Sequence, residues 1–418
     1  MQRRDFIKKF TLLSTSMWAP SFLVRGIRAA QSMDSTPFEL DSNRILVVIE
    51  LAGGCDGLNT VVPFTNDSYY LRRPGLAIPP AGVYALDDVV GLHPAMGGVN
   101  ELFDDGKAAL VQGVGYPNPN RSHFRSRDIW HTAEPDEIGS GGWLARYIGQ
   151  YPSGTSFQGV NVGGKVPQAL TSQEGSSPSI QSIDTYQIQT DGHYPGDDDN
   201  KNDAFQEVIG QTQNQYPLQE YVAQTALDAT VSSVQLLEGQ ENYQSSIQYP
   251  ATAFAQKLKT IAQIVAADLG VSVFYATLGG FDTHAAQVSN GNSAEGQHAV
   301  LLETLSSALK AFLDDLQEMG RDQDSLIMTF SEFGRRLSEN GSLGTDHGTS
   351  NQMFVFSPSL VPGLYGSHPG LSDNELDEIG DMRFTVDFRS VYSTVLSGWL
   401  GVDPEPVLGE SFPDLGFL

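Results

Sequence analysis

Three apolar runs along the chain have the length and composition of buried β-strands. Residues 44–51, 271–278 and 326–330 keep their apolar side chains together instead of alternating them with polar ones, which is typical of strands covered on both faces. Residues 108–114 and 353–356 share this character. We therefore predict a sheet whose central strands are buried on both sides.

Segments with the spacing of amphipathic helices lie between the predicted strands. The longest are residues 251–269 and 294–319. Further helices are expected at 93–103, directly after Ser122, at 143–147, at 216–240 and at 388–400, and an irregular surface segment is expected at 63–80. Strands that alternate with long helices predict an α/β fold, a three-layer αβα domain with a mostly parallel central sheet.

One stretch interrupts this alternation. Glutamine, serine and asparagine dominate residues of about 165–215, together with an aspartate run at 197–199. This composition predicts an exposed insertion at one edge of the sheet, and a cap over the functional site is an alternative. No internal repeat or further boundary is visible, so residues 31–418 are expected to form a single domain.

The first thirty residues have the pattern of an export signal. Arg3 and Arg4 precede an uncharged, moderately apolar stretch at 10–24, and small residues at 27–30 offer a cleavage site. A Sec signal or a membrane anchor is the alternative, but the stretch is shorter than the ~20 residues that a spanning helix needs. We predict a twin-arginine signal at 1–30, the twin-arginine translocase as a partner during export, no stable membrane span, and a periplasmic or secreted protein.

Charge and cysteine content exclude several kinds of partner. The chain has 50 Asp and Glu against 24 Lys and Arg, a formal net charge of −26. A field of this sign repels nucleic acid and anionic membranes, although solubility alone is the simpler explanation for most of the charge. Cys55, the single cysteine, excludes an intrachain disulfide, and a small buried filler is favoured there over a nucleophilic thiol.

Glycine and a carboxylate follow each of three predicted central strands, at Asp56, Asp282 and Glu332. Ligands of α/β proteins bind at the carboxyl ends of the strands, and carboxylates and imidazoles are ligands of divalent metals. Asp282 and His284 lie two residues apart in an extended exit, so their side chains point the same way. The alternative is a turn in which Asp282 accepts backbone N–H groups, with Asp56 and Glu332 as caps or turn formers.

Asp346 and His347 add a second carboxylate–imidazole pair between Gly344 and Gly348. Adjacent side chains diverge in regular structure, but a glycine-flanked loop can turn both inward. Asp346 is therefore either a metal ligand itself or the partner that orients His347. The convergence of these segments predicts a divalent metal site.

Ser122 is the candidate nucleophile. A hydroxyl at a helix start, facing a cationic cluster, is activated by metal coordination and by the positive helix end, whereas a simple N-cap is the alternative role. Basic side chains surround it: Arg121, His123, Arg125 and Arg127. These arginines either pair with Asp128 and Glu134 or bind an oxyanion bidentately.

Several motifs occur together in this chain: 53–63, 121–124, 280–284, 331–335, 344–348, 387–392 and 399–401. With the twin-arginine leader they resemble the bacterial family called domain of unknown function 1501, over nearly the whole chain after the leader. That family looks like a distant branch of the alkaline-phosphatase-like superfamily, whose members hydrolyse or transfer phosphate and sulfate esters at one or two metals.

The resemblance implies a metal cluster and a nucleophile in this sequence. The implied ligands are Asp56, Asp282, His284, Glu332 and His347, with Ser122 at the nucleophile position and Arg121 and His123 beside it. Zinc is the first expectation for the ion, with magnesium, manganese or calcium as alternatives. Two departures from the superfamily pattern, Phe333 in place of a histidine and the short spacing from Asp282 to His284, predict that a second metal is absent or has different ligands.

Two functions are therefore expected from the sequence. The first is an exported, metal-dependent hydrolase of phosphate or sulfate esters that acts on small or polysaccharide-linked substrates. The alternative is a non-catalytic metal-binding or structural protein of the cell envelope on the same scaffold.

Overall fold

The computed structural model describes residues 43–139, 141–153, 157–173, 175–186, 233–289 and 291–418. The predicted signal at 1–30 and the later part of the polar insertion, 187–215, lie outside the described residues, as does most of the helix expected at 216–240. Residues 233–242 are helical. None of the helices in the described part is both long and apolar enough to cross a membrane.

A central sheet of nine strands organises the fold. Its strands are β1 (Ile45–Ala52), β5 (Ala108–Gly115), β6 (Gly159–Val162), β9 (Ser179–Ile180), β10 (Val273–Gly279), β11 (Ser325–Phe330), β12 (Asn351–Phe356), β13 (Gly363–Tyr365) and β14 (Val386–Asp387). Their order across the sheet is β13-β5-β12-β11-β1-β10-β6-β9, and β14 also pairs with β5. The five strands predicted from apolar runs, β1, β5, β10, β11 and β12, are all present.

Most of these strands run in parallel. β1 pairs in parallel with β10 on one side and β11 on the other, which places Ile49 beside Ala276 and Thr329. β6 continues this direction next to β10, and β9 next to β6. β12 is antiparallel to both β11 and β5, while β13 and β14 are parallel to β5. The predicted mostly parallel sheet is confirmed, with β12 as the reversed strand within it.

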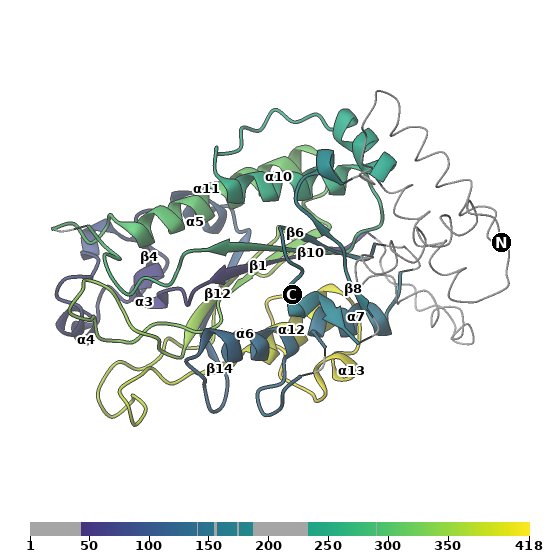
Figure 1. Ribbon diagram of the computed structural model, residues 1–418. Helices are drawn as coiled ribbons and strands as arrows, with labels where there is room; N and C mark the ends of the chain where they lie inside the picture. The colour runs from purple at the N-terminus through teal and green to yellow at the C-terminus, as the bar shows by residue number, and fades with distance from the viewer. Residues whose placement is uncertain (1–42, 140, 154–156, 174, 187–232, 290) are drawn as a thin grey trace, which may run out of the picture.

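Helices cover both faces of this sheet (Figure 1). One layer holds α5 (Gly97–Asp104), α10 (Ala253–Ala266) and α11 (Gln297–Glu318), and the other holds α6 (His123–Thr132), α7 (Trp143–Gln150), α12 (Phe388–Thr394) and α13 (Glu405–Leu408). The three-layer αβα prediction is therefore confirmed. The helix expected from residue 294 begins only at Gln297, because Gly296 before it has φ +119°, outside the helical range.

Shorter elements fill the connections. They are α3 (Gly57–Thr60), α4 (Asp67–Arg72), β2 (Val61–Val62), β3 (Tyr84–Ala85), β4 (Gly91–Leu92), β7 (Thr171–Ser172), β8 (Gly175–Ser176), three 3₁₀ turns (Pro80–Gly82, Gln168–Leu170 and Ile183–Thr185) and a π-helical turn (Val395–Trp399) that continues α12. α4 lies inside the segment expected to be irregular, because Asn66 caps it by accepting the Ser68 N–H at 3.0 Å.

The described part of the polar insertion lies at one edge of the sheet. It supplies β9, the last strand in the sheet order, and the β7–β8 hairpin. Its apolar residues Leu170 and Ile180 are buried, so this part of the insertion contributes to the core.

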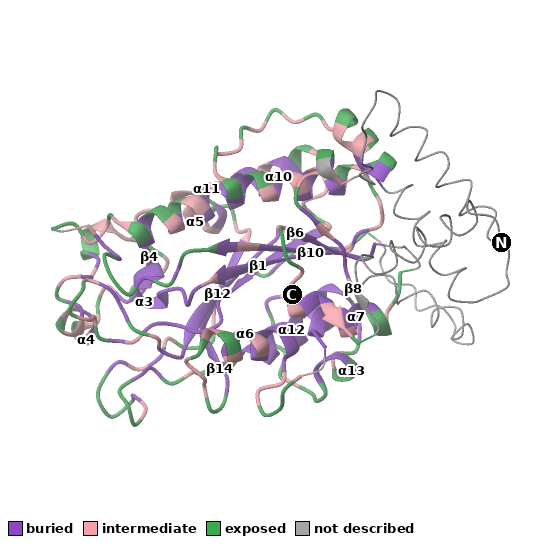
Figure 2. Ribbon diagram, in the orientation of Figure 1, coloured by how far each residue is buried: buried purple, intermediate pink, exposed green. Residues whose placement is uncertain are grey.

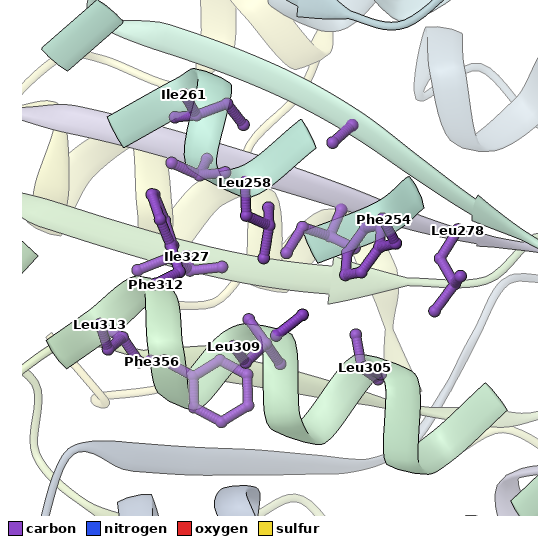
Figure 3. Packing of buried hydrophobic residues seen from close by; sticks show 14 of the residues in the cluster. Phe254, Leu258, Ile261, Leu278, Leu305, Leu309, Phe312, Leu313, Ile327 and Phe356 are labelled. Atoms are coloured by element: carbon purple, nitrogen blue, oxygen red, sulfur yellow. The ribbon is translucent and has the colours of Figure 1, made fainter. Parts of the chain in front are cut away.

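The strands of the sheet are mostly buried between the two helix layers (Figure 2). Alternate residues of each central strand belong to two separate cores: Val47 and Ile49 of β1 pack with α10 and α11, whereas Leu46 and Val48 pack with the other helices. Along α11, Leu305, Leu309, Phe312 and Leu313 follow helical spacing and point toward the sheet, where Ile327 and Phe356 lie (Figure 3).

Replacing Phe312 with alanine tests this core. Phe312→Ala leaves a cavity between α11 and the sheet, so we expect the free energy of unfolding to fall by about 3–5 kcal/mol. Phe124→Ala is the matched control, because the Phe124 residue is 89% exposed. Urea unfolding followed by circular dichroism measures both variants, and equal stabilities would contradict the packing described here.

Candidate metal centre

The candidate site lies where three loops at one edge of the sheet meet the start of α6. Asp282 and His284 follow β10, Glu332 follows β11, and His347 lies in the loop that enters β12. His123 is the first residue of α6, which follows β5. The carboxyl ends of the parallel strands and the amino end of the reversed β12 lie at the same edge of the sheet, and this arrangement brings the side chains together.

One carboxylate oxygen stands at the centre of this site. Asp282 Oδ1 lies 3.1 Å from Nε2 of His284, 3.2 Å from Nε2 of His347 and 3.5 Å from Nε2 of His123. The ligand atoms of His123, Asp282 and His347 all lie within 4.8 Å of one another. The sequence placed Asp282, His284 and His347 among its candidate ligands, whereas His123 was a candidate catalytic residue beside Ser122 and not a ligand.

Each of these imidazoles is oriented through its other nitrogen. Nδ1 of His123 lies 2.8 Å from Glu332 Oε1, and Nδ1 of His284 lies 3.2 Å from Asp346 Oδ1. Nδ1 of His347 lies 2.8 Å from the backbone carbonyl oxygen of Arg121. Since carboxylates and carbonyls accept hydrogen bonds, each Nδ1 carries a proton, which leaves Nε2 as the nitrogen that faces Asp282, as a donor when it is protonated and as a metal ligand when it is not.

This donor arrangement fits a divalent metal ion. Nε2 of His284 lies 2.9 Å from Nε2 of His347, so the two nitrogens can share either a proton, in a hydrogen bond, or a metal cation. Nε2 of His123 is buried and has no hydrogen-bond partner among the described residues. Imidazole nitrogens together with one carboxylate are the ligands that zinc and similar transition metals prefer.

The charges of the site are set by its neighbours. Burial raises the pKa of Asp282, but hydrogen bonds from Arg335, with Nη2 at 2.6 Å, and from His347 outweigh it and lower that pKa to about 2. The hydrogen bond to Glu332 raises the pKa of His123 against the opposing effect of burial. Asp282 is therefore an ionised carboxylate at neutral pH.

Glu332 lies behind His123. Its side chain is fully buried, and Oε1 accepts the N–H of Gly53 at 2.9 Å as well as facing His123. Oε2 also accepts this N–H, at 3.2 Å. Because both oxygens are engaged, Glu332 orients an imidazole and is not among the convergent ligand atoms.

Asp346 orients His284 and not His347, the residue that the sequence offered as its partner. Its carboxylate also accepts the side-chain amide of Asn340 at 3.3 Å, and about half of the side chain is exposed. The loop that carries His347 therefore supplies the hydrogen-bond acceptor that orients His284 in the neighbouring loop.

Asp56 forms a buried ion pair instead of joining the imidazoles. Nη1 of Arg73 lies 2.6 Å from Asp56 Oδ2, and both side chains are fully buried. Burial raises the pKa of Asp56, but the charge and hydrogen bond of Arg73 hold it below its ordinary value. Asp56 is not among the convergent ligand atoms, but its Oδ1 is buried and has no hydrogen-bond partner among the described residues, so its role as a ligand stays a prediction.

Gln287 links Asp56 to the two loops that carry the ligands. Its Nε2 donates to Asp56 Oδ2 at 2.5 Å, and its Oε1 accepts the hydroxyls of Thr283 at 2.9 Å and Thr345 at 2.8 Å. Thr283 lies between Asp282 and His284, and Thr345 precedes the Asp346–His347 pair. Gln287 therefore fixes the two loops relative to each other. No feature of the sequence indicated this role.

Ser122 occupies the predicted position at the start of α6. It is the N-cap residue with φ −88° and ψ 125°, and its side chain makes no capping hydrogen bond. The residue is exposed, and its N–H donates to Asn120 Oδ1 at 2.9 Å. The hydroxyl is thus not committed to the helix and stands one residue before His123.

Arginines around Ser122 pair with carboxylates. Arg121 Nε lies 2.6 Å from Asp381 Oδ2, and its Nη2 lies 2.9 Å from Asp377 Oδ2. Arg125 pairs with Asp128, as one of the sequence interpretations expected. The contribution of Arg121 to the site is its backbone carbonyl, which holds His347.

Phe333 fills the position at which the resembled superfamily usually has a histidine. Its ring centroid lies 4.9 Å from that of His123 and 4.7 Å from that of His347. Gly54 makes room for it, since a Cβ at Gly54 would lie 2.3 Å from Phe333 Cε2. An aromatic ring therefore packs against two of the imidazoles at this position.

Cys55 is buried, and its sulfur lies 3.4 Å from Thr60 Oγ1. Burial raises the pKa of the thiol to about 12, so the reactive thiolate is disfavoured. These observations agree with the role of a small buried filler.

A family model described as "Protein of unknown function (DUF1501)" matches residues 43–409. The chain belongs to the DUF1501 family. The matched region contains every residue of the candidate centre, and it confirms the family resemblance found in the sequence. No curated protein matches the sequence of this DUF1501 chain.

Solved structures similar to this DUF1501 chain share little sequence with it. The C-terminal periplasmic domain of EcEptC from Escherichia coli is 10% identical, with 90% of each chain covered and a TM-score of 0.37. The PsFucS1 sulfatase from Pseudoalteromonas sp. is 12% identical, with 86% and 68% covered and a TM-score of 0.37. A protein in the alkaline phosphatase superfamily from Vibrio parahaemolyticus is 11% identical, with 94% and 78% covered and a TM-score of 0.35. Similarity this low carries no argument about the chemistry of the site.

Substituting Gln287 tests whether it positions the centre. Gln287→Met keeps the side-chain length but removes the acceptor shared by Thr283 and Thr345, so both loops lose a common anchor. Losing such an orienting partner lowers metal affinity roughly tenfold to hundredfold, and we expect that loss for zinc in a chelator competition titration. Gln256→Met, on an exposed position of α10, is the control. A folded Gln287→Met protein with unchanged zinc affinity would contradict the role given to Gln287.

Proposed function

We propose that this DUF1501 chain binds a divalent metal ion, zinc by its ligand types, and hydrolyses phosphate or sulfate esters. The observation that carries the proposal is the convergence of three Nε2 atoms on Asp282 Oδ1, each imidazole being fixed through Nδ1. The proposed ligands are His123, Asp282 and His347, whose ligand atoms all lie within 4.8 Å of one another, and His284, outside this set, is a further candidate because its Nε2 lies 3.1 Å from Asp282 Oδ1. Magnesium and calcium prefer oxygen ligands, so this donor set favours zinc over them.

The proposed chemistry assigns the nucleophile to Ser122. The bound metal would act as a Lewis acid on the ester oxygens and the attacking hydroxyl. Ser122 is supported by its exposure, its uncommitted hydroxyl and its place directly before His123 at the amino end of α6. The unpaired N–H groups of that helix end add partial positive charge where negative charge develops.

Substrate class and cellular location extend the proposal. The twin-arginine pattern in the first thirty residues supports export, and therefore a periplasmic or extracellular substrate. Small esters and polysaccharide-linked esters both meet this requirement.

One observation favours the alternative, a metal-binding envelope protein without catalysis. The guanidinium of Arg121, a sequence candidate for binding an oxyanion, is engaged by Asp377 and Asp381. Such a protein would bind the metal with the same ligands and show no turnover.

Metal content is the first test. Elemental analysis of the purified protein is expected to find about one zinc per chain, as one set of convergent ligands provides one position. Asp282→Asn is expected to reduce this occupancy by about tenfold or more, because it removes the only charged ligand of the set. Asp373→Asn, at a side chain that is 83% exposed, serves as the control. Equal metal content in the wild-type protein and Asp282→Asn would contradict the assignment.

Turnover separates the two functions. We expect the zinc-loaded protein to hydrolyse aryl phosphates or sulfates, and Ser122→Ala to lower kcat by about 1,000-fold or more while it retains the metal. Ser307→Ala on α11 controls for the loss of a hydroxyl. Metal binding without turnover in folded wild-type protein would support the non-catalytic function, whereas full activity of Ser122→Ala would remove Ser122 from the mechanism.

A further inference from the structure

A cavity of about 240 Å³ adjoins the candidate metal centre. The two share Phe333, whose ring contacts the imidazoles of His123 and His347 and also lines the cavity. The other lining residues come from the end of β5 and the loop after it, from the loop before β12 and from the segment before β14: Gly115, Tyr116, Pro119, Asn120, Thr349, Asp377, Met382, Arg383 and Phe384.

Aromatic and apolar side chains form most of the cavity wall. Tyr116, Phe333, Met382 and Phe384 present rings or a thioether, which bind flat apolar groups well. The Tyr116 hydroxyl is already engaged with Ser126 Oγ at 2.7 Å, so its ring is what it offers to a ligand.

The carboxylate of Asp377 is already occupied. Its Oδ1 accepts the backbone N–H groups of Ile379 at 3.0 Å and Asp381 at 2.8 Å, and its Oδ2 pairs with Arg121. Asp377 therefore brings little free negative charge to the cavity.

Arg383 differs from the other arginines close to the centre. Arg121, Arg125, Arg127 and Arg335 each form an ion pair. Arg383 donates from Nε to the backbone carbonyl of Leu376 at 3.0 Å, and it makes no ion pair within the residues that the structure describes. Its Nη atoms are therefore available to an anion at an exposed position of the cavity wall.

We infer that this cavity binds a flat apolar ring that carries an anionic group. The ring lies against Phe333, Met382 and Phe384, and the anion pairs with the guanidinium of Arg383. If the protein hydrolyses esters, as the proposed function states, the alcohol part of the substrate would carry this ring and would lie in the cavity next to the metal centre.

The test measures binding directly, so that it does not depend on turnover. The probe is 2-naphthoate, which has both the ring and the charge. The comparison compounds are 2-naphthol, which has the ring without the charge, and acetate, which has the charge without the ring. Each compound is titrated into the full chain in a calorimeter, with and without zinc. We expect 2-naphthoate to bind in both states, and to bind more tightly than either comparison compound.

Two variants locate the probe. Arg383→Gln is expected to weaken 2-naphthoate by about tenfold, the size of a charge-assisted hydrogen bond, and to leave 2-naphthol unchanged. Phe384→Ala is expected to weaken both naphthyl compounds. Arg321→Gln, three residues after the end of α11, is the control for loss of an arginine, and circular dichroism verifies the fold of each variant.

Other results would overturn the inference. Absence of 2-naphthoate binding in folded protein, or binding that requires zinc and is unaffected by Arg383→Gln, would show that the cavity is not the site. Ester hydrolysis is assayed separately: if 2-naphthoate binds as expected but no ester is turned over, the proposed function fails while the ring-and-anion site stands.

Discussion

The buried guanidinium of Arg335 holds together the loops that form the candidate centre. Its Nε donates to the Gly54 carbonyl at 2.6 Å, its Nη1 to Thr345 at 2.8 Å, and its Nη2 to Phe281 at 3.1 Å and to Asp282 Oδ1 at 2.6 Å. A buried cation is stable only when it is paired and fully hydrogen-bonded, so Arg335 requires an ionised Asp282. The central carboxylate of the site is therefore also a structural requirement of the fold, and a metal would share it with a fixed protein cation.

The direction of β12 decides which loop reaches the centre. Apolar runs predicted the central strands and their alternation with helices, because buried parallel strands and amphipathic helices leave strong periodic signals. The direction of a strand leaves no such signal, and the apolar run at 353–356 is equally compatible with a parallel and an antiparallel strand. Since β12 is antiparallel to β11, the loop before it, with Asp346 and His347, lies beside the exits that follow β10 and β11. In a parallel strand the same loop would lie at the opposite edge of the sheet.

Sequence reasoning found the region of the site more readily than the role of each residue. Asp282, His284 and His347 were identifiable because glycine-flanked carboxylate and imidazole groups follow or precede predicted strands. Glu332 has the same local pattern, yet it accepts hydrogen bonds from Gly53 and His123, and these partners are more than 200 positions away in the chain. The sequence pattern of a strand-end carboxylate is the same whether the carboxylate faces a metal, an imidazole or an arginine. Its role depends on which partner the fold places beside it.

The distribution of charge implies an order of binding at this centre. The formal net charge of the chain is −26. Two arginines close to the imidazoles form ion pairs with carboxylates of the chain itself: Arg121 pairs with Asp377 and Asp381, and Arg127 pairs with Glu50. Such a field concentrates cations and repels anions. Under the proposed function, a metal ion would gain from this field before any ester arrives, and the ester would meet an attractive site only after the metal had supplied positive charge. Of the chain's described arginines near the centre, Arg383 alone is left to attract an anion directly, and its place on the cavity wall puts that attraction beside the metal position and not on it.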